Sequence, residues 1–196
     1  MIPVGPFHLD RIIGRGGMGE VWRARHVDGR HTVAVKVLTS QAAQDLYFQA
    51  SFRNEARAAA GLTHPNIAAV FDYGRIPAEA DRASEGRLRA GSPYLVMEMA
   101  AGGSLEGHLG RLEWRDIRVI LLCLLDALAH AHARGVVHRD LKPGNALLAG
   151  GWGRVKLTDF GLAHAPGSDS ALREDEGAVG TPAYMAPEQF EGSWRD

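Results

Sequence analysis

Residues 138–145 read His-Arg-Asp-Leu-Lys-Pro-Gly-Asn and form the densest cluster of polar side chains in the chain. Asp159-Phe160-Gly161 follows Asp140 by nineteen residues, and Ala186-Pro187-Glu188 closes the segment after that. We take this cluster as the candidate functional centre and work outward from it.

A long amphipathic helix is predicted immediately before the cluster. Apolar residues from Ile117 to Ala131 recur at spacings of three and four, which is the period of a helix with one buried face. The helix should end at Gly135, because glycine is favoured just after a helix C-terminus. Val136-Val137 and residues 154–157 are short strand candidates around the loop, and we interpret Lys156 as a solvated strand residue.

The first half of the chain predicts strands separated by glycine-bearing turns, with Asp28-Gly29 as a strong hairpin signal. Residues 41–62 are rich in Ala, Arg, Glu and Gln and predict a helix that ends near Pro65. Residues 74–92 carry four arginines and three acids but few large apolar groups, so we expect a solvated, mobile hairpin extension. The predicted strands are residues 7–13, 21–25, 32–38, 67–73 and 94–99.

A glycine-rich stretch from Gly14 to Gly19 contains the pattern G-x-G-x-x-G. The pattern alone is weak, because glycine-rich turns are common. In a dinucleotide-binding unit the third glycine opens a helix, whereas here a strand pattern begins at Val21. The glycines therefore predict a hairpin tip whose backbone N–H groups can approach phosphates closely.

Lys36 lies in the next predicted strand, where alternation places Ala34 and Lys36 on one face and Val33 and Val35 on the other. Only three of the 22 basic residues are lysine, and an ammonium group is a point charge that arginine does not imitate. Lys36 is therefore a candidate phosphate ligand, with an exposed strand lysine as the plain alternative.

The composition excludes several classes of protein. The 196 residues, 45% hydrophobic and 23% charged, suit one domain or two small lobes. A net charge of -1 gives no support to a nucleic-acid or membrane-surface partner. Cys123 is the only cysteine, which excludes an intrachain disulfide. The N-terminus has no signal-peptide pattern and no apolar run is long enough to span a membrane, so we expect a soluble, cytoplasmic domain.

Taken together, these motifs resemble the catalytic domain of a eukaryotic-like serine/threonine protein kinase, and they run in the family order from Gly14 to Glu188. The residues around Glu188 resemble the bacterial members of the family. The resemblance implies an α+β, two-lobed fold. Residues 1–100 would form the N-lobe, with a five-stranded antiparallel sheet, one main helix and a hinge at 98–100. Residues 101–196 would form a partial, mainly helical C-lobe.

The resemblance also implies the catalytic roles, with ATP and Mg²⁺ as cofactors and a protein Ser/Thr hydroxyl as acceptor. Asp140 would take the acceptor proton, and Lys142 would approach the γ-phosphate, as in the serine/threonine class. Thr181 fits that class as well. Glu55 would hold Lys36 against the α- and β-phosphates, while Asn145 and Asp159 would bind Mg²⁺.

The implied nucleotide site joins the glycine hairpin to the hinge. Met97 resembles the gatekeeper, and Val21, Ala34 and Leu147 would enclose the adenine, although ordinary core packing also explains these three. The nucleotide-binding candidates are Ile13, Gly14, Arg15, Gly16, Gly17, Met18, Gly19, Glu20, Val21, Ala34, Lys36, Met97, Glu98, Ala100 and Leu147.

The family's lower lobe continues through further helices, whereas this chain ends at Asp196, eight residues after Glu188. We therefore expect a C-terminally truncated copy that is poorly stable and weakly active or inactive alone. The alternative function is a catalytically inactive, pseudokinase-like module for nucleotide binding or protein interaction. Against it, the expected catalytic residues are all present: Lys36, Glu55, Asp140, Asn145 and Asp159.

Overall fold

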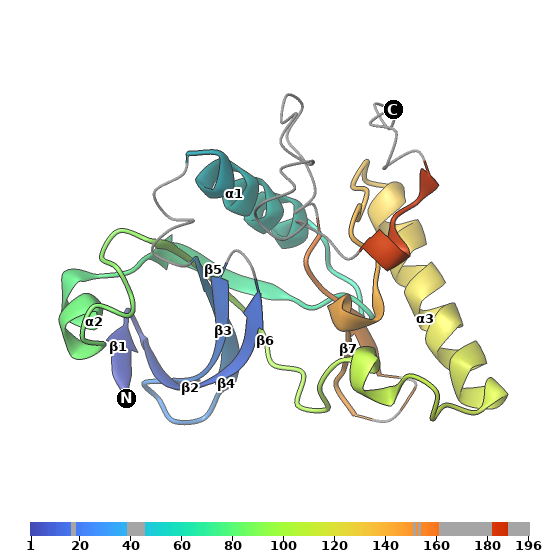
Figure 1. Cartoon of the computed structure of the whole chain (residues 1–196), viewed down its shortest axis with the longest axis horizontal. Helices are drawn as coiled ribbons and strands as arrows, with labels where there is room; N and C mark the ends of the chain where they lie inside the picture. The colour runs from blue at the N-terminus through green and yellow to red at the C-terminus, as the bar shows by residue number, and fades with distance from the viewer. Residues whose placement is uncertain (17–18, 39–45, 151, 153, 161–181, 188–196) are drawn as a thin grey trace.

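The computed structural model describes residues 1–16, 19–38, 46–150, 152, 154–160 and 182–187, with residues 46–48, 51, 55 and 182 described by backbone alone. A six-stranded antiparallel sheet occupies the N-terminal half, and a long helix lies at the opposite end of the molecule (Figure 1). The strands are β1 (Ile2–Val4), β2 (Phe7–Gly16), β3 (Gly19–His26), β4 (Thr32–Leu38), β5 (Val70–Arg75) and β6 (Pro93–Glu98). Their order in the sheet is β1-β2-β3-β4-β6-β5.

The expectation of five strands is wrong by one, because β1 also pairs with β2. Pro3 lies in this strand although proline cannot donate to a sheet ladder. The structure accommodates Pro3 because β1 is the edge strand, and Gly5 makes the tight turn to β2 with a φ of 55°. Val4 is fully buried, which explains why this short strand docks.

The two faces of the sheet carry separate cores, and β4 supplies both. Val33, Val35 and Val37 pack with Trp22 in one core, whereas Ala34 and Leu38 pack in the other. Helix α1 (Leu46–Ala60) covers the second face through Phe52 and Ala56. The predicted alternation in this strand therefore agrees with the structure. The predicted helix extended two residues further, to 62, and its residues 41–45 lie outside the described part of the chain.

The expectation of a solvated, mobile extension at residues 74–92 is wrong. The segment contains a short helix, α2 (Ala78–Ala83), on the side of the sheet away from α1 (Figure 1). Ile76, Ala80 and Leu88 are at most 3% exposed and belong to the first core. Three well-spaced apolar side chains are enough to dock the segment, although its overall composition is polar.

The second half is built around α3 (Trp114–His132), as the apolar repeat predicted. Ile120, Ala127 and Ala131 are buried, while Leu121 and Leu125 on the same helix are exposed. Gly135 follows the helix with a φ of 71°, the left-handed conformation expected of a glycine there. None of the described helices has the length and hydrophobicity of a membrane span. The other elements are the 3₁₀ turns η2 (Leu105–His108), η3 (Pro143–Asn145) and η5 (Pro182–Tyr184), and the hairpin β7 (Ala146–Leu148) with β8 (Val155–Leu157).

Val136-Val137 forms no strand, contrary to expectation. Val136 instead packs beside Ala131, and its N–H donates to the Ala131 carbonyl at 3.0 Å. The link between the two halves comes from the loop before β5: Ala68 donates to the Leu157 carbonyl at 2.9 Å, and Leu157 donates to the Asn66 carbonyl at 2.8 Å. These bonds hold β8, and the residues just after it, against the N-terminal half.

Candidate active site

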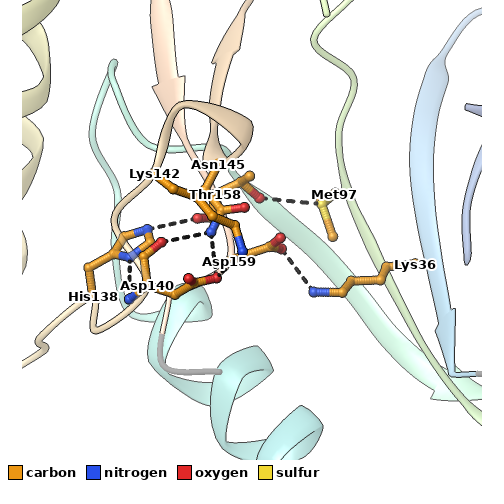
Figure 2. Close-up of polar contacts among 8 residues, drawn as sticks. All are labelled: Lys36, Met97, His138, Asp140, Lys142, Asn145, Thr158 and Asp159. Carbon is orange, nitrogen blue, oxygen red and sulfur yellow. Dashed lines mark hydrogen bonds and ion pairs between the residues drawn. The ribbon is translucent and has the colours of Figure 1, made fainter. Parts of the chain in front are cut away.

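The first feature of the site is an ion pair between residues 123 positions apart. Lys36 Nζ lies 2.9 Å from Asp159 Oδ1 (Figure 2). Lys36 is only 7% exposed, on the α1-facing side of β4, and Asp159 follows β8 closely. Burial of an unpaired ammonium group costs free energy, and the ion pair with Asp159 offsets that cost. The pair also directs the Lys36 side chain toward the segment after β8.

The second feature is a group of three side chains from the loop after α3. Lys142 Nζ lies 2.8 Å from Asp140 Oδ2, and Asn145 Nδ2 donates to the same oxygen at 2.9 Å. Asn145 Nδ2 also donates to the Asp140 carbonyl at 2.8 Å. These contacts fix the orientation of the Asp140 carboxylate, since both donors converge on one of its oxygens (Figure 2).

Two buried residues, His138 and Thr158, join these features. Asn145 accepts a backbone hydrogen bond from Thr158 at 3.0 Å, and His138 Nε2 lies 2.8 Å from the Thr158 carbonyl. Lys36, Asp140 and Asp159 therefore lie in one region of the structure (Figure 2). Sequence reasoning assigned no role to His138 or Thr158, although each stands directly beside a quoted motif residue.

The backbone around the site is strained at two non-glycine residues. Arg139 and Asp159 have φ values of 67° and 62°. Such left-handed conformations cost about 1–3 kcal/mol each and persist only when surrounding contacts enforce them. Here the hydrogen bonds of the neighbouring residues His138 and Thr158 hold the backbone in place. The carboxylates of Asp140 and Asp159 therefore project from backbone that is firmly held.

The buried His138 ring predicts a pH dependence of stability. Burial lowers the pKa of His138 below its usual value of about 6.5, and this outweighs the opposing effect of the Thr158 carbonyl. Below pH 6.5, His138 binds a proton in the unfolded chain but remains neutral in the folded chain. The free energy of unfolding therefore falls as the pH falls toward the lowered pKa. We expect His138→Gln to reduce this slope by up to about 1.4 kcal/mol per pH unit.

Urea unfolding of the wild-type and His138→Gln proteins at intervals from pH 7 to pH 5 measures the two slopes. His130, whose pKa is also lowered, chiefly by burial, is present in both proteins and contributes equally to each. Equal slopes would show that His138 does not remain neutral in the folded protein.

The glycine hairpin joins β2 and β3, as predicted. Gly14 pairs with Val21 and Gly16 with Gly19, while Gly17 and Met18 lie outside the described residues. A Cβ atom on Gly19 would lie 2.3 Å from the Val37 carbonyl oxygen. The base of the hairpin therefore approaches β4 too closely for any side chain at this position.

This close approach makes Gly19→Ala a disruptive substitution. We expect a loss of about 1–3 kcal/mol of unfolding free energy, as for other overpacked sites. Gly16→Ala is the matched control, because its Cβ would meet no atom of the described residues within 4 Å. Thermal unfolding distinguishes the two variants, and equal midpoints would contradict the expected clash.

The predicted adenine neighbours fall into two groups. Val21, Ala34 and Met97 belong to the core beneath α1, so ordinary packing also explains their types. Met97 in addition lies 3.8 Å from Thr158 Oγ1, which places it beside the Asp159 segment. Of the remaining candidates, Leu147 in β7 and Ala100 after β6 are half-buried, and Ile13 is 42% exposed.

The side chains of Glu98 and Glu20 have other partners. Glu98 Oε2 lies 2.7 Å from Lys156 Nζ, so the interpretation of Lys156 as a solvated residue is wrong. Glu20 Oε1 lies 3.3 Å from Arg15 Nε and 3.5 Å from Arg87 Nη2. Because side chains alternate along β3, Glu20 shares the face of Trp22, opposite to Val21. For these two glutamates, only the backbone remains a nucleotide-binding candidate.

The side chains of two predicted catalytic residues, Glu55 and Thr181, lie outside the described part of the chain. Glu55 lies in α1, but its side chain is outside the described residues. Thr181 is outside them altogether.

Comparison with known protein families shows which family carries this arrangement of residues. The family model for the protein kinase domain matches residues 7–194. The chain belongs to the protein kinase family. The expected α+β, two-lobed kinase fold is thereby confirmed, with a curled antiparallel sheet in the N-lobe and α3 in the C-lobe.

Two bacterial proteins and one solved bacterial structure illustrate the similarity. The serine/threonine-protein kinase PknA of Mycobacterium tuberculosis is 47% identical over 194 residues, covering 96% of this chain and 42% of PknA. The probable serine/threonine-protein kinase PknB of Bifidobacterium longum is 39% identical over 196 residues, covering 98% of this chain and 28% of PknB. A crystal structure of the Mycobacterium tuberculosis PknI kinase domain matches with a TM-score of 0.68 and 28% identity, covering 98% of this chain and 67% of that one. The chain thus spans less than half the length of these two curated relatives.

Proposed function

We propose that the protein is an ATP- and Mg²⁺-dependent protein kinase that transfers the γ-phosphoryl group to Ser or Thr hydroxyls of proteins. The observation that carries the proposal is the convergence of Lys36, Asp159 and Asp140 on one region. A buried cation for phosphates, an oxygen ligand for a metal and an oriented carboxylate are the parts that phosphoryl transfer requires.

The residues fit the cofactors by their chemistry. Mg²⁺ prefers oxygen ligands and is commonly bound by one or two protein groups together with phosphate oxygens and water. Asp159 and Asn145 supply such oxygens. Bound ATP would supply the transferable phosphoryl group.

The remaining roles follow from the contacts. Asp140 would orient the acceptor hydroxyl and take its proton on a carboxylate oxygen. Lys142, paired with Asp140 at 2.8 Å, would place a positive charge beside the transferred group. Lys36 would bind phosphate oxygens and Glu55 would position it, while the hairpin from Gly14 to Gly19 would cover the phosphates.

We propose that residues 1–100 and 101–196 act as the two lobes, with residues 98–100 as the hinge. The backbone of this hinge would bind adenine, and the ring would lie among Val21, Ala34, Met97 and Leu147. We place the domain in the cytoplasm, where ATP is available, with a protein substrate and no nucleic-acid partner. The complete set of Lys36, Asp140, Asn145 and Asp159 disfavours the pseudokinase alternative.

Transfer of labelled phosphate tests the proposal. The protein, supplied with Mg²⁺ and γ-labelled ATP, should label a general protein substrate, and acid hydrolysis should yield phosphoserine or phosphothreonine. Nucleotide binding measured alongside separates the two functions. Binding without transfer at any protein substrate would favour the pseudokinase reading, and labelled tyrosine alone would overturn the assignment to Ser/Thr.

A further inference from the structure

A chain of contacts on the outer face of the N-lobe sheet connects residues 76–92 to the glycine hairpin. The guanidinium of Arg87 lies over the Trp22 ring, 5.4 Å from its centroid, and Arg87 Nη2 lies 3.5 Å from Glu20 Oε1. Arg15 Nε lies 3.3 Å from the same Glu20 oxygen. One carboxylate thus receives two arginines, one from within the hairpin and one from a segment more than sixty residues away in the sequence.

The backbone of Arg87 is held firmly enough to act on the hairpin. Its N–H donates to the Ser84 carbonyl at 3.1 Å, and the next residue, Leu88, donates to Ser84 Oγ at 2.9 Å. Leu88 is 3% exposed in the core with Trp22. The segment is closed at its base, where Ile76 donates to the Ser92 carbonyl at 2.8 Å. Arg87 therefore projects from a docked element onto β3.

The contacted residues lie in the part of β3 nearest to the tip of the hairpin, with Glu20 second and Trp22 fourth in the strand. Glu20 pairs across the hairpin with Arg15, and it directly follows Gly19, which is packed against Val37. Three of the four residues from 16 to 19 are glycine, the residue type with the greatest backbone freedom in an unfolded chain. A contact at Glu20 and Trp22 is therefore the last side-chain restraint from outside the hairpin, among the described residues, before its tip.

We propose that Arg87 is a positioning residue for nucleotide binding, which acts through Glu20 and Trp22 to hold the glycine hairpin over the phosphates. This inference rests on the proposed function. Glu20 and Trp22 lie on the sheet face opposite to Lys36, so Arg87 touches neither the nucleotide nor the reacting atoms. Its effect is to reduce the conformations that the hairpin must give up when a nucleotide binds.

Arg87→Ala should weaken binding of Mg²⁺-ATP and raise its KM about three- to tenfold, while kcat changes less than twofold. The expected change in KM is modest because the Arg87 side chain is 46% exposed. Ion pairs and cation–π contacts of exposed side chains are individually weak. Arg89→Ala is the matched control, since Arg89 lies in the same segment and its side chain has no ion pair or hydrogen bond among the described residues. The control should match the wild type in both constants.

Two further measurements identify the route. Arg87→Lys keeps the charge but loses the planar fork, so it should fall between Arg87→Ala and the wild type. Glu20→Gln combined with Arg87→Ala should cost less than the sum of the two single changes, because both remove the same contact. The proposal would be overturned if the effects of Glu20→Gln and Arg87→Ala on the KM for ATP were strictly additive. It would also be overturned if Arg87→Ala had the same KM for ATP as Arg89→Ala.

Hydrogen exchange separates this inference from the proposed function. Without nucleotide, Arg87→Ala should speed amide exchange in residues 14–22 several-fold and leave α3 unchanged. Faster hairpin exchange in a protein that binds no nucleotide would refute the kinase function yet keep the restraint by Arg87. Unchanged exchange in a protein that binds ATP would refute the restraint and keep the function. Exchange that rises throughout the sheet would show that Arg87 serves only the core.

Discussion

Replacing Asp140 with asparagine should lower kcat by about 10²–10⁴-fold while leaving the dissociation constant for Mg²⁺-ATP within about twofold of the wild type. Asparagine keeps the shape of the side chain, and its amide oxygen can still accept from Asn145 Nδ2, which lies 2.9 Å from Asp140 Oδ2. It cannot accept the proton of an acceptor hydroxyl. The chemical step is therefore lost, whereas the contacts of Lys36 and Asp159 with each other remain.

Asp126→Asn is the control for this substitution. Asp126 is an exposed carboxylate on α3 that lies 3.2 Å from His64 Nε2, away from the cluster around Asp140. Its removal should leave kcat within twofold of the wild type. Steady-state transfer of labelled phosphate and equilibrium binding of a fluorescent ATP analogue give the two constants. A variant at Asp140 that keeps wild-type kcat would exclude this carboxylate as the proton acceptor.

The second large effect is expected at Lys36. Lys36→Met should reduce kcat/KM by about 10²–10³-fold, the size found when one preorganised group that stabilises developing charge is removed. Methionine preserves the length of the side chain and its packing on β4, but it removes the only charge that β4 presents at this face. Asp159, which lies 2.9 Å from Lys36 Nζ, would lose that partner at the same time.

Arg23→Met provides the comparison for Lys36→Met. Arg23 is a cation of the same sheet, paired with Asp10 across β2 and β3, and it lies outside the candidate site. We expect this variant to keep kcat/KM within about threefold of the wild type. Thermal unfolding of both variants checks that the fold persists. If Lys36→Met were no more impaired than Arg23→Met, Lys36 would not be a phosphate ligand.

Patterns confined to a few residues predicted the local structure well. Alternation along β4 correctly placed Lys36 on the face opposite to Val35, because side chains on a strand must alternate. The three-and-four repeat predicted α3, and Gly135 marked its end. The glycines at 14–19 predicted a hairpin because a strand pattern follows them. Each of these depends on backbone geometry that neighbouring residues determine.

The errors occurred where a distant partner decided the outcome. Residues 74–92 looked solvated by composition, but three apolar side chains dock them on the sheet. Lys156 looked exposed, but it reaches Glu98, 58 residues away in the sequence. Val136-Val137 had strand-forming residues and no strand to pair with. The composition of a segment therefore does not predict which part of the folded protein the segment packs against.

The sequence by itself determined the candidate residues, because phosphoryl transfer needs particular functional groups and these stand in short motifs from Gly14 to Glu188. Only the tertiary structure decided that Lys36 meets Asp159, that Glu20 turns away from the site toward Arg87, and that His138 is buried beneath Thr158. The physical reason is that a motif specifies chemistry over a few residues, whereas the pairing of charges depends on which strands become neighbours and which face of each strand is buried.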